Sequence, residues 1–250
     1  MERFKFESIN KLHNALREVE MLVHVAHENE QDNEKYLTYL KVALLLLLTK
    51  FENFVEDTAQ EYVDFINDMN IPSEHIPLTL KVSHTNCAIR NKLQIIDDVT
   101  RLSDISDIFT ELAQLWVQRV DGNVFNNVSI DLKFNYGKHG ENDLRNLFKK
   151  IGHVDIFAEI RVLKRGEGMI EGPNVLDFKG MFNSNVRIRN NIIHEDATPN
   201  LTYLSLEEYT DYYRQFSEGL VILLEEDLEL IGNTINQRPQ IALLEQTSLN

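Results

Sequence analysis

The sequence predicts an all-α protein, a multi-helix bundle arranged around one long central helix. Glycine and proline, which most often interrupt helices, number only 10 and 5 in a chain of 250 residues. Apolar residues recur along most of the chain at the three- and four-residue spacing that places them on one helical face. Because 43% of the residues are hydrophobic, the chain can bury a sizeable core. We expect a single helical domain over residues 1–250, with a candidate lobe boundary near 121–140.

The first two helices carry the clearest apolar patterns. The first is expected from Phe4 to His27, with a stripe made of Leu12, Leu16, Val19, Val23 and Ala26. The second is expected from Glu34 to Met69, a rod of about 50 Å at the usual helical rise. Its consecutive leucines, Leu44 to Leu48, point all the way round the helix, so other elements should cover it on several sides. We therefore place this helix at the centre of the bundle.

The middle of the chain predicts two more long helices and one irregular stretch. The helices are expected over Leu78–Ile96 and Ser103–Val120. The second of them should turn its apolar residues inward, namely Ile105, Ile108, Phe109, Leu112, Leu115 and Trp116. The asparagine-rich stretch that follows contains a candidate strand pair at Val128–Phe134. A short helix should begin at Leu144, and Ile156–Leu163 fits either a helix or a strand.

The C-terminal third predicts a motif helix and a long closing helix. A glycine-rich stretch leads into the motif helix, which is expected over 174–195. Ser205, followed three residues later by Glu208, is typical of a capping box, so the closing helix should start there and run to about Ile231. The tail, 238–250, is expected to be loose or to form a short extra helix.

The chain is acidic, with 25 Lys and Arg against 40 Asp and Glu and a formal net charge of -15. This balance excludes a general nucleic-acid binder held by many phosphate contacts, so an RNA substrate would need a local basic surface. The lone Cys87 excludes a disulfide framework and indicates a reducing, cytoplasmic setting. The N-terminus lacks a signal-peptide pattern, and the apolar run Val42–Leu48 is far shorter than the ~20 residues of a membrane span. We therefore expect no membrane association.

A row of ionisable side chains lies beside the apolar stripe of the first helix: His13, Glu20, His24 and His27. Histidine and glutamate three or four residues apart can bind a transition metal, which would make the protein a small-ligand-binding bundle. Neutral histidines also flank helical cores without any ligand, and nothing nearby in the sequence supplies further metal ligands. We therefore expect neither a metal nor a cofactor.

The stretch Val186–His194 is the one place where the sequence points to chemistry. Helical spacing sorts it into two faces. Val186, Arg189 and Ile193 continue an apolar stripe that begins with Val175, Phe178 and Phe182, whereas Arg187, Asn190, Asn191 and His194 gather on the adjoining polar face. An arginine beside a core face is costly unless it is paired or used, which singles out Arg189. The ordinary explanation is a helix end, with His194 at the negative end of the helix dipole.

The spacing of these residues resembles the signature of the HEPN superfamily. That signature is an arginine, often followed by a polar residue, then four to six residues and a histidine, near the end of a helix in an α-helical bundle. Arg189 fits with a spacing of four and is followed by Asn190, while Arg187 fits with a spacing of six before His194. The long upstream helix, the polar loop after His194 and the amphipathic closing helix resemble stand-alone HEPN proteins of toxin–antitoxin and phage-defence loci.

The resemblance implies a metal-independent endoribonuclease that acts as a toxin or phage-defence effector. RNA would be cut by attack of its 2′-hydroxyl, leaving a cyclic phosphate. Arg189, Asn190 and His194 would be catalytic, since imidazole transfers protons near neutral pH and guanidinium stabilises phosphorane charge. The RNA-binding residues would be Arg187, Asn191, Lys164 and Arg165. Because one histidine cannot easily be both acid and base, the resemblance also implies a homodimer with a composite cleft.

The resemblance further suggests an antitoxin or another defence protein as a partner. In the branch that is regulated by nucleotide transfer, a tyrosine stands two positions after the histidine. Asp196 occupies that position here, so this regulation is not expected. The second interpretation is a HEPN-fold protein without catalysis, acting as a dimeric scaffold or partner-binding module. The acidic charge favours this alternative, and the complete motif favours the nuclease.

Overall fold

The computed structural model of the chain describes residues 4–69, 71–96, 102–116, 129–136, 140–160, 178–195 and 200–247, with side chains described in these ranges except at 74, 91–96, 102–105 and 234–247. The helices are α1 (Glu7–Glu28), α2 (Asn33–Asp68), the short η1 (Ser73–His75), α3 (Leu78–Ile96), α4 (Leu102–Trp116), α5 (Glu141–Lys149), α6 (Ile156–Glu159), α7 (Phe178–Glu195) and α8 (Tyr203–Thr247). All regular secondary structure in the described ranges is helical, which confirms the all-α class.

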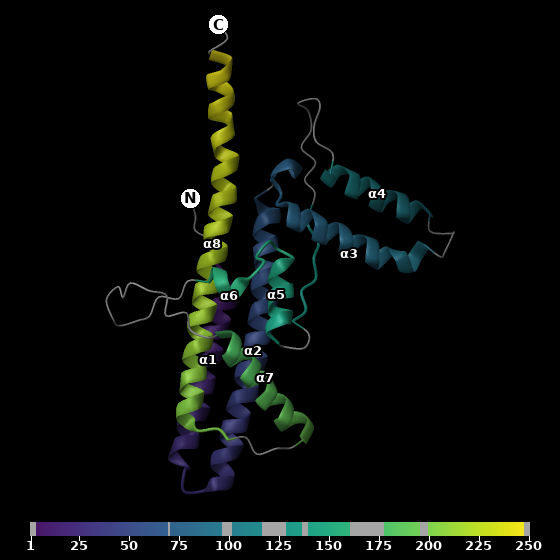
Figure 1. Cartoon of the computed structure of the whole chain (residues 1–250). Coiled ribbons are helices and arrows are strands. Elements are labelled where there is room, and N and C mark those ends of the chain that lie inside the picture. Colours follow the sequence, from purple (N-terminus) through teal and green to yellow (C-terminus); the bar gives the residue numbers. More distant parts are fainter. Residues whose placement is uncertain are drawn as a thin grey trace.

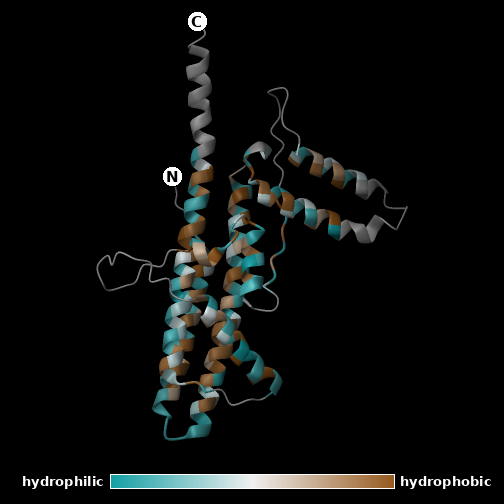
Figure 2. Cartoon of the chain, viewed as in Figure 1, coloured by the Kyte–Doolittle hydropathy of each residue, from teal (hydrophilic) through white to brown (hydrophobic). Residues whose placement is uncertain are grey.

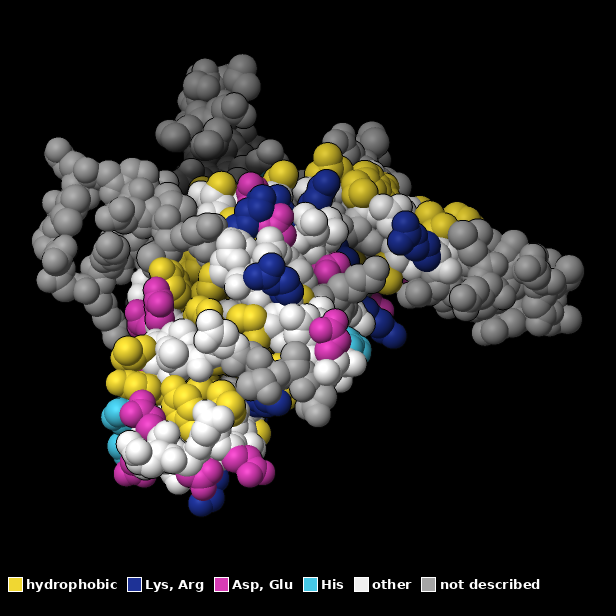
Figure 3. All heavy atoms as spheres, turned by 60° about the horizontal axis from the view of Figure 1, so that its bottom comes forward, with side chains coloured by type: hydrophobic (Ala, Val, Ile, Leu, Met, Phe, Trp, Pro, Cys, Tyr) yellow, Lys and Arg dark blue, Asp and Glu magenta, His cyan; other side chains and the backbone are white. Residues whose placement is uncertain are grey.

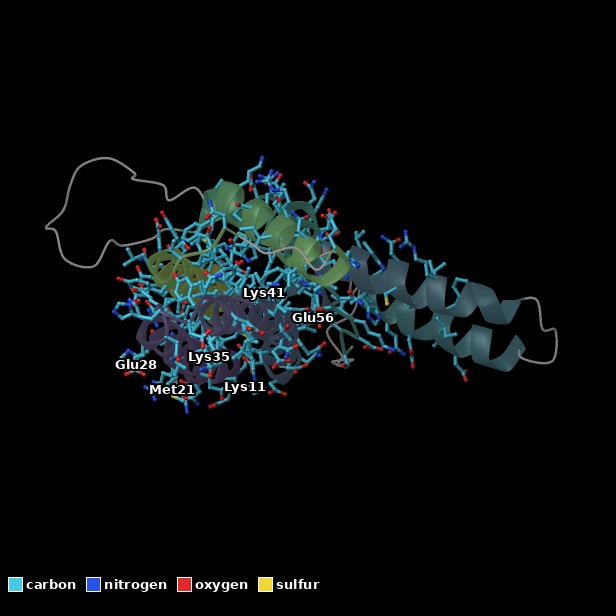
Figure 4. The ribbon with its side chains drawn as sticks, turned by 90° about the horizontal axis from the view of Figure 1, so that it is seen from below. Lys11, Met21, Glu28, Lys35, Lys41 and Glu56 are labelled. Carbon is cyan, nitrogen blue, oxygen red and sulfur yellow. The ribbon has the colours of Figure 1, made fainter. Side chains whose placement is uncertain are left out.

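Three long helices form the main bundle. α1, α2 and α8 lie side by side, with α1 running opposite to the other two (Figure 1). α2 contacts α1 and α8, and it also carries α5 and α7 on its remaining flank. The α3–α4 hairpin follows the end of α2 and projects sideways from the bundle, as the view from below shows (Figure 4). α2 is therefore the central rod that the leucine run predicted.

The core follows the apolar patterns of these helices. All five residues of the predicted α1 stripe are buried. Of the leucine run on α2, Leu44, Leu47 and Leu48 are buried, and Leu45 and Leu46 are partly buried against the core. Hydrophobic and hydrophilic residues alternate along the three long helices, as the brown and teal segments of the ribbon show (Figure 2). Burying this much apolar surface is the main term that stabilises the bundle.

An aromatic cluster joins α2, α7 and α8. The ring of Phe51 on α2 lies 5.1 Å from that of Phe182 on α7 and 4.6 Å from that of Tyr213 on α8, measured between centroids. Phe178 and Phe182 both pack on Phe216, at 5.2 and 5.1 Å. The Phe51–Phe182 rings are tilted and the other three pairs are edge-to-face. Aromatic pairs add about 0.5–1.5 kcal/mol each beyond their burial. The first half of α7 is thus fixed to the bundle.

The predicted strand pair at 128–134 is not present in the described part, residues 129–136. The segment does turn alternate residues inward, since Ile130, Leu132 and Tyr136 are at most 4% exposed and Phe134 is partly buried. Its backbone pairs with side chains instead of a second strand. The Asn67 amide donates to the carbonyl of Ile130 at 3.0 Å and accepts from its N–H at 2.8 Å, while a Glu56 carboxylate accepts from the N–H of Tyr136. The alternating apolar residues therefore predicted the burial of this segment correctly, but they did not predict what its backbone would hydrogen-bond with.

The predicted inward face of α4 is partly wrong. Leu112 and Leu115 are buried, and Ile108 is half-buried, but Phe109 and Trp116 are 58% and 44% exposed. The helix packs mainly on α3 and η1. Because these elements cover one side of α4, that side is buried, and Phe109 and Trp116 remain open to solvent.

α8 starts before the predicted capping box. Thr202 and Ser205 form the reciprocal pair: the Ser205 hydroxyl accepts from the Thr202 N–H at 2.9 Å, and the Thr202 hydroxyl accepts from the Ser205 N–H at 3.1 Å. Leu201 and Leu206, on either side of this cap, are buried, whereas Leu204 is 59% exposed. The helix then continues to Thr247, past the predicted end at Ile231 and through most of the tail that was predicted to be loose.

The remaining predictions fall partly outside the described residues. α5 begins at Glu141, slightly before the predicted Leu144, and α6 makes the first half of 156–163 helical. Most of the candidate lobe boundary near 121–140 is not described. Among the described residues, no helix is both long enough and apolar enough to cross a membrane.

Candidate functional site

The candidate site lies on α7, which is anchored at its start and more exposed toward its end. Phe178, Phe182, Asn185 and Ile192 are its buried residues. Near the start, Lys179 pairs with Glu141 of α5 at 3.3 Å, and the Asn183 amide donates to the same carboxylate at 3.2 Å. The N-terminal half is therefore held by both aromatic packing and polar contacts.

The predicted apolar stripe is wrong at its end. Ile193 was expected to face the core, but it is 48% exposed, and its neighbour Ile192 is 9% exposed. Both are isoleucines, so only the rotation of the helix about its axis decides which one is buried. The buried side runs through Phe182, Asn185 and Ile192, with Ile188 partly buried beside it.

The polar face carries three of the expected site residues in the open. Arg187, Asn191 and His194 are exposed and lie on the side of α7 opposite its buried residues. Arg187 and His194 are seven residues apart, close to two full helical turns, so they share a face at an axial spacing of about 10 Å. No hydrogen bond joins His194 to another described residue, including Asn190, which is four residues away and on the same side of a helix.

Arg189 and Asn190 lie at the border between the buried and the open faces. Both are half-buried, and the Arg189 guanidinium donates through Nη1 to Oδ1 of Asn190 at 3.2 Å. The side chains of Arg189 and Asn190, two residues of the predicted motif, are therefore in direct contact. Arg189 points to a different side of the helix from His194, so the two can act on one phosphate only if the RNA or a second chain bridges these sides.

A family model described as RiboL-PSP-HEPN matches residues 10–229. The chain belongs to this family. No curated protein and no solved structure matches the chain. The matched region runs from α1 through most of α8 and includes Arg187, Arg189 and His194. Membership in the RiboL-PSP-HEPN family confirms the HEPN resemblance and makes a ribonuclease-type domain a reasonable expectation.

Two expected RNA contacts and one motif neighbour lie outside the described residues of this RiboL-PSP-HEPN chain. They are Lys164, Arg165 and Asp196. Glu195, the last residue of α7, is described and exposed directly beside His194. Its carboxylate places a negative charge next to the histidine, where a phosphate would have to approach.

The histidine row of α1 does not converge on one point. His24 faces Glu28 at 3.4 Å, His27 faces Glu30 at 3.2 Å, and His13 faces Glu218 of α8 at 3.4 Å. Glu20 pairs with Arg214 instead. No group of three or more metal-binding side chains occurs in the part of the chain that the structure describes.

Two buried polar side chains that were not predicted from the sequence lie directly behind the motif. Asn185 and Tyr213 are both fully buried, and neither the Asn185 amide nor the Tyr213 hydroxyl has a hydrogen-bond partner among the described residues. Burial raises the pKa of Tyr213, which the neighbouring Asn185 amide partly opposes. In the sequence, Asn185 is a polar residue at a position of α7 where the helical spacing calls for an apolar one. That mismatch could have indicated a buried polar side chain.

Proposed function

We propose that the protein is a metal-independent endoribonuclease that cuts RNA through attack of a 2′-hydroxyl, leaving a cyclic phosphate. The observation that carries this proposal is the HEPN-type Arg-Asn…His motif on the exposed end of α7, in a chain that belongs to the RiboL-PSP-HEPN family. The exposed His194 has the access that an RNA strand requires. No bound metal is needed for this chemistry, because imidazole and guanidinium groups supply the proton transfer and the charge stabilisation.

His194 takes the role of proton carrier. An imidazole can remove the proton from the 2′-hydroxyl or deliver one to the leaving 5′-oxygen near neutral pH. One side chain cannot hold both protonation states at once, so a second His194 from another copy completes the acid–base pair. We therefore place the site between two chains related by a two-fold axis, where their α7 helices meet.

The two arginines take different roles in this arrangement. Arg187 shares the open face with His194 and is placed to hold the scissile phosphate with the planar fork of its guanidinium. Arg189 is half-buried and holds Asn190, so it orients the amide and presents its remaining N–H groups at the edge of the site. Asn191, together with Lys164 and Arg165, would contact the flanking RNA.

RNA cleavage in EDTA tests this proposal. We expect wild-type protein to produce cyclic-phosphate ends, and His194→Ala to lower the rate by about a hundredfold or more, the usual value of a general acid or base. Arg187→Ala and Arg189→Ala show which arginine acts on the phosphate. His24→Ala, an exposed histidine on α1, is the matched control and should cut like wild type. Intact RNA from a well-folded dimer would contradict the nuclease.

We further propose that this cleavage serves a toxin or phage-defence role. Expression of the wild type should then arrest growth, and His194→Ala should relieve the arrest. A neighbouring antitoxin or other defence protein is the partner class we propose, since an unrestrained ribonuclease damages its own cell.

The alternative is a non-catalytic scaffold of HEPN fold. It is favoured by the net charge of -15 and by the exposed Glu195 beside His194, both of which repel RNA. In that case neither the wild type nor His194→Ala would cut RNA, and His194→Ala would change only dimerisation or partner binding.

A further inference from the structure

The outer side of α5 carries uncharged polar and basic side chains. The buried residues of this helix are apolar and face the rest of the fold, namely Leu144, Leu147 and Phe148. Asn142, Asn146 and Lys149 are exposed on the opposite side, at a spacing of four and three residues, so they form one stripe. Asp143 lies to the side of this stripe, where its carboxylate accepts from the Gly140 N–H at 3.4 Å. We call the stripe of Asn142, Asn146 and Lys149 the α5 strip.

The α5 strip continues the open face of α7. Asn183 of α7 is exposed and lies four residues before Arg187, on the same side of the helix as His194. Its amide donates to the Glu141 carboxylate at 3.2 Å, and its Oδ1 accepts from the Glu141 N–H at 3.5 Å. The open face of α7 therefore touches the first residue of α5. Both helices contact α2 and turn their buried sides to the bundle, so their exposed stripes face away from it on the same flank (Figure 1).

Basic side chains without an acidic partner gather on this flank. On segment 129–136, at the end of α5 and on α7, five of them form no ion pair with any described residue, namely Lys133, Lys149, Lys150, Arg187 and Arg189. Glu141 and Asp155, in contrast, are already paired, with Lys179 at 3.3 Å and with Arg145 at 3.1 Å. The exposed Asp131 offsets Lys133, so the unpaired positive charge lies at the end of α5 and along α7. In a chain with a net charge of -15, this is where an anionic ligand can bind.

The far end of α7 points toward an acidic surface. α7 runs toward the end of the bundle where α1 joins α2 (Figure 1). Glu28, Glu30 and Glu34 are exposed there, and acidic side chains surround that tip in Figure 3. Phosphates that continue past His194 in this direction meet like charge, whereas phosphates that run toward α5 meet the lysines at its end. The charges therefore direct a strand from His194 back along α7 to the α5 strip.

We propose that the α5 strip is a binding site for single-stranded RNA, which holds the strand that extends from the α7 motif. This inference rests on the proposed ribonuclease function, because it requires RNA at His194. The asparagine amides can donate to and accept from the edges of unpaired bases, and the lysines can bind phosphates. No large hydrophobic side chain of α5 is exposed, so the strip lacks the apolar centre that is usual in a protein–protein contact.

Negative charge added to the strip tests the inference in the full chain carrying His194→Ala, so that RNA binds without being cut. The double substitution Asn142→Asp with Asn146→Asp changes the charge of the strip and almost nothing of its shape. The dissociation constant for a labelled uridine homopolymer of about 12 nucleotides should rise about tenfold or more. Added salt should reduce this difference, because screened charges repel less, whereas a folding defect would persist. Lys149→Ala should raise the dissociation constant about two- to fivefold, the usual effect of one exposed charge pair.

The matched control is Asn10→Asp with Asn14→Asp on α1, which should bind RNA like its His194→Ala parent. These asparagines are also exposed and four residues apart on one helix. Lys11 and Met21 mark the position of α1 in Figure 4, on the side of the bundle away from α7. Circular dichroism of all variants verifies that the helices are intact.

The outcomes separate this inference from the proposed function. Equal weakening by the α1 and α5 pairs, or no effect of the α5 pair on an RNA that the wild type cuts, would overturn the α5 strip and leave the nuclease standing. Selective weakening by the α5 pair together with absent cleavage by the wild type would support the strip and contradict only the nuclease. No binding of RNA by the His194→Ala parent would overturn the strip, and intact RNA after incubation with the wild type would then contradict the nuclease as well.

Discussion

At the scale of single residues, Tyr62 is the clearest link between the central helix and the last one. Its hydroxyl donates to Oδ2 of Asp227 across the α2–α8 contact. Burial, followed by the charge and the hydrogen bond of Asp227, raises the pKa of Tyr62. The folded protein therefore keeps this phenol protonated at pH values where the unfolded chain ionises it. Its contribution to stability is complete below about pH 10, the unfolded value, and is lost as the pH rises above it.

We predict that Tyr62→Phe lowers the free energy of unfolding by about 1–3 kcal/mol at pH 7, because the half-buried Asp227 carboxylate loses its donor. Urea denaturation measures this change. The loss of stability above about pH 10 should also become shallower in the variant, since one raised tyrosine pKa is removed. Tyr39→Phe, a partly buried tyrosine on the same helix, is the control and should change the unfolding free energy little. Equal losses of unfolding free energy in Tyr62→Phe and Tyr39→Phe would show that the hydrogen bond from Tyr62 to Asp227 does not stabilise the fold.

At Asn185, in contrast to Tyr62, removing the polar group should not destabilise the protein. Its amide is fully buried behind the motif and faces the Tyr213 hydroxyl without reaching hydrogen-bond geometry. An unpaired buried polar group costs about 1–3 kcal/mol. Asn185→Leu keeps the branched shape and the number of side-chain heavy atoms and removes that cost, so the free energy of unfolding should stay level or rise. Asn191→Leu on the open side of α7 is the control. A clear loss of stability in Asn185→Leu would indicate that a bound water satisfies the amide.

At the scale of elements, the start of α8 tests which capping pair is real. Thr202 and Ser205 satisfy each other's N–H groups, whereas Glu208 is exposed. Thr202→Ala should therefore lower the free energy of unfolding by about 1 kcal/mol. Glu208→Ala, which would break the capping box expected from the sequence, should have almost no effect. Urea denaturation of both variants distinguishes the Thr202–Ser205 cap from the Ser205–Glu208 capping box. A larger effect of Glu208→Ala would support a helix that starts at Ser205.

Helix bounds could be read from the sequence because apolar spacing is a strong local signal. α1, α2 and α3 begin and end within a few residues of their predicted positions. The faces of α4 and α7 could not be read in the same way. Ile192 and Ile193 are adjacent and chemically equal, and the exposure of Phe109 and Trp116 depends on how little of the molecule reaches α4. Those facts are set by neighbours distant in the sequence.

The motif itself was recognisable from residue types and spacing, but its geometry was not. Helical spacing places Asn190 and His194 on the same polar face. In the structure, Asn190 instead accepts a hydrogen bond from Arg189. A helical wheel gives directions and cannot choose between a neighbour one residue away and one a turn away. It likewise left Arg187 and Arg189 as equal candidates, whereas their exposure distinguishes an open arginine from a half-buried one.

At the scale of the whole molecule, the charge of -15 limits how any RNA is held. A long-range field of this sign repels the strand, so attraction must come from the few basic side chains close to the site. For single-stranded RNA, the logarithm of the binding constant falls with the logarithm of salt concentration by about 0.7 per neutralised phosphate. Arg187 and Arg189 from two copies neutralise at most about four phosphates, which gives a slope no steeper than about -3.

Titrating labelled RNA into His194→Ala protein at several salt concentrations measures this slope without cleavage. From the arginines of α7 alone we predict a slope between zero and about -3. The slope should become shallower by about 1.4 in an added Arg187→Ala substitution, because each dimer then loses two phosphate contacts. Lys164 and Arg165 of two copies would together contribute about another -3 if they also bound phosphates. A slope near -6 that returns to about -3 in the Lys164→Ala, Arg165→Ala double variant would assign the RNA surface mainly to the segment before α7. A slope unaffected by Arg187→Ala would remove that arginine from the proposed site.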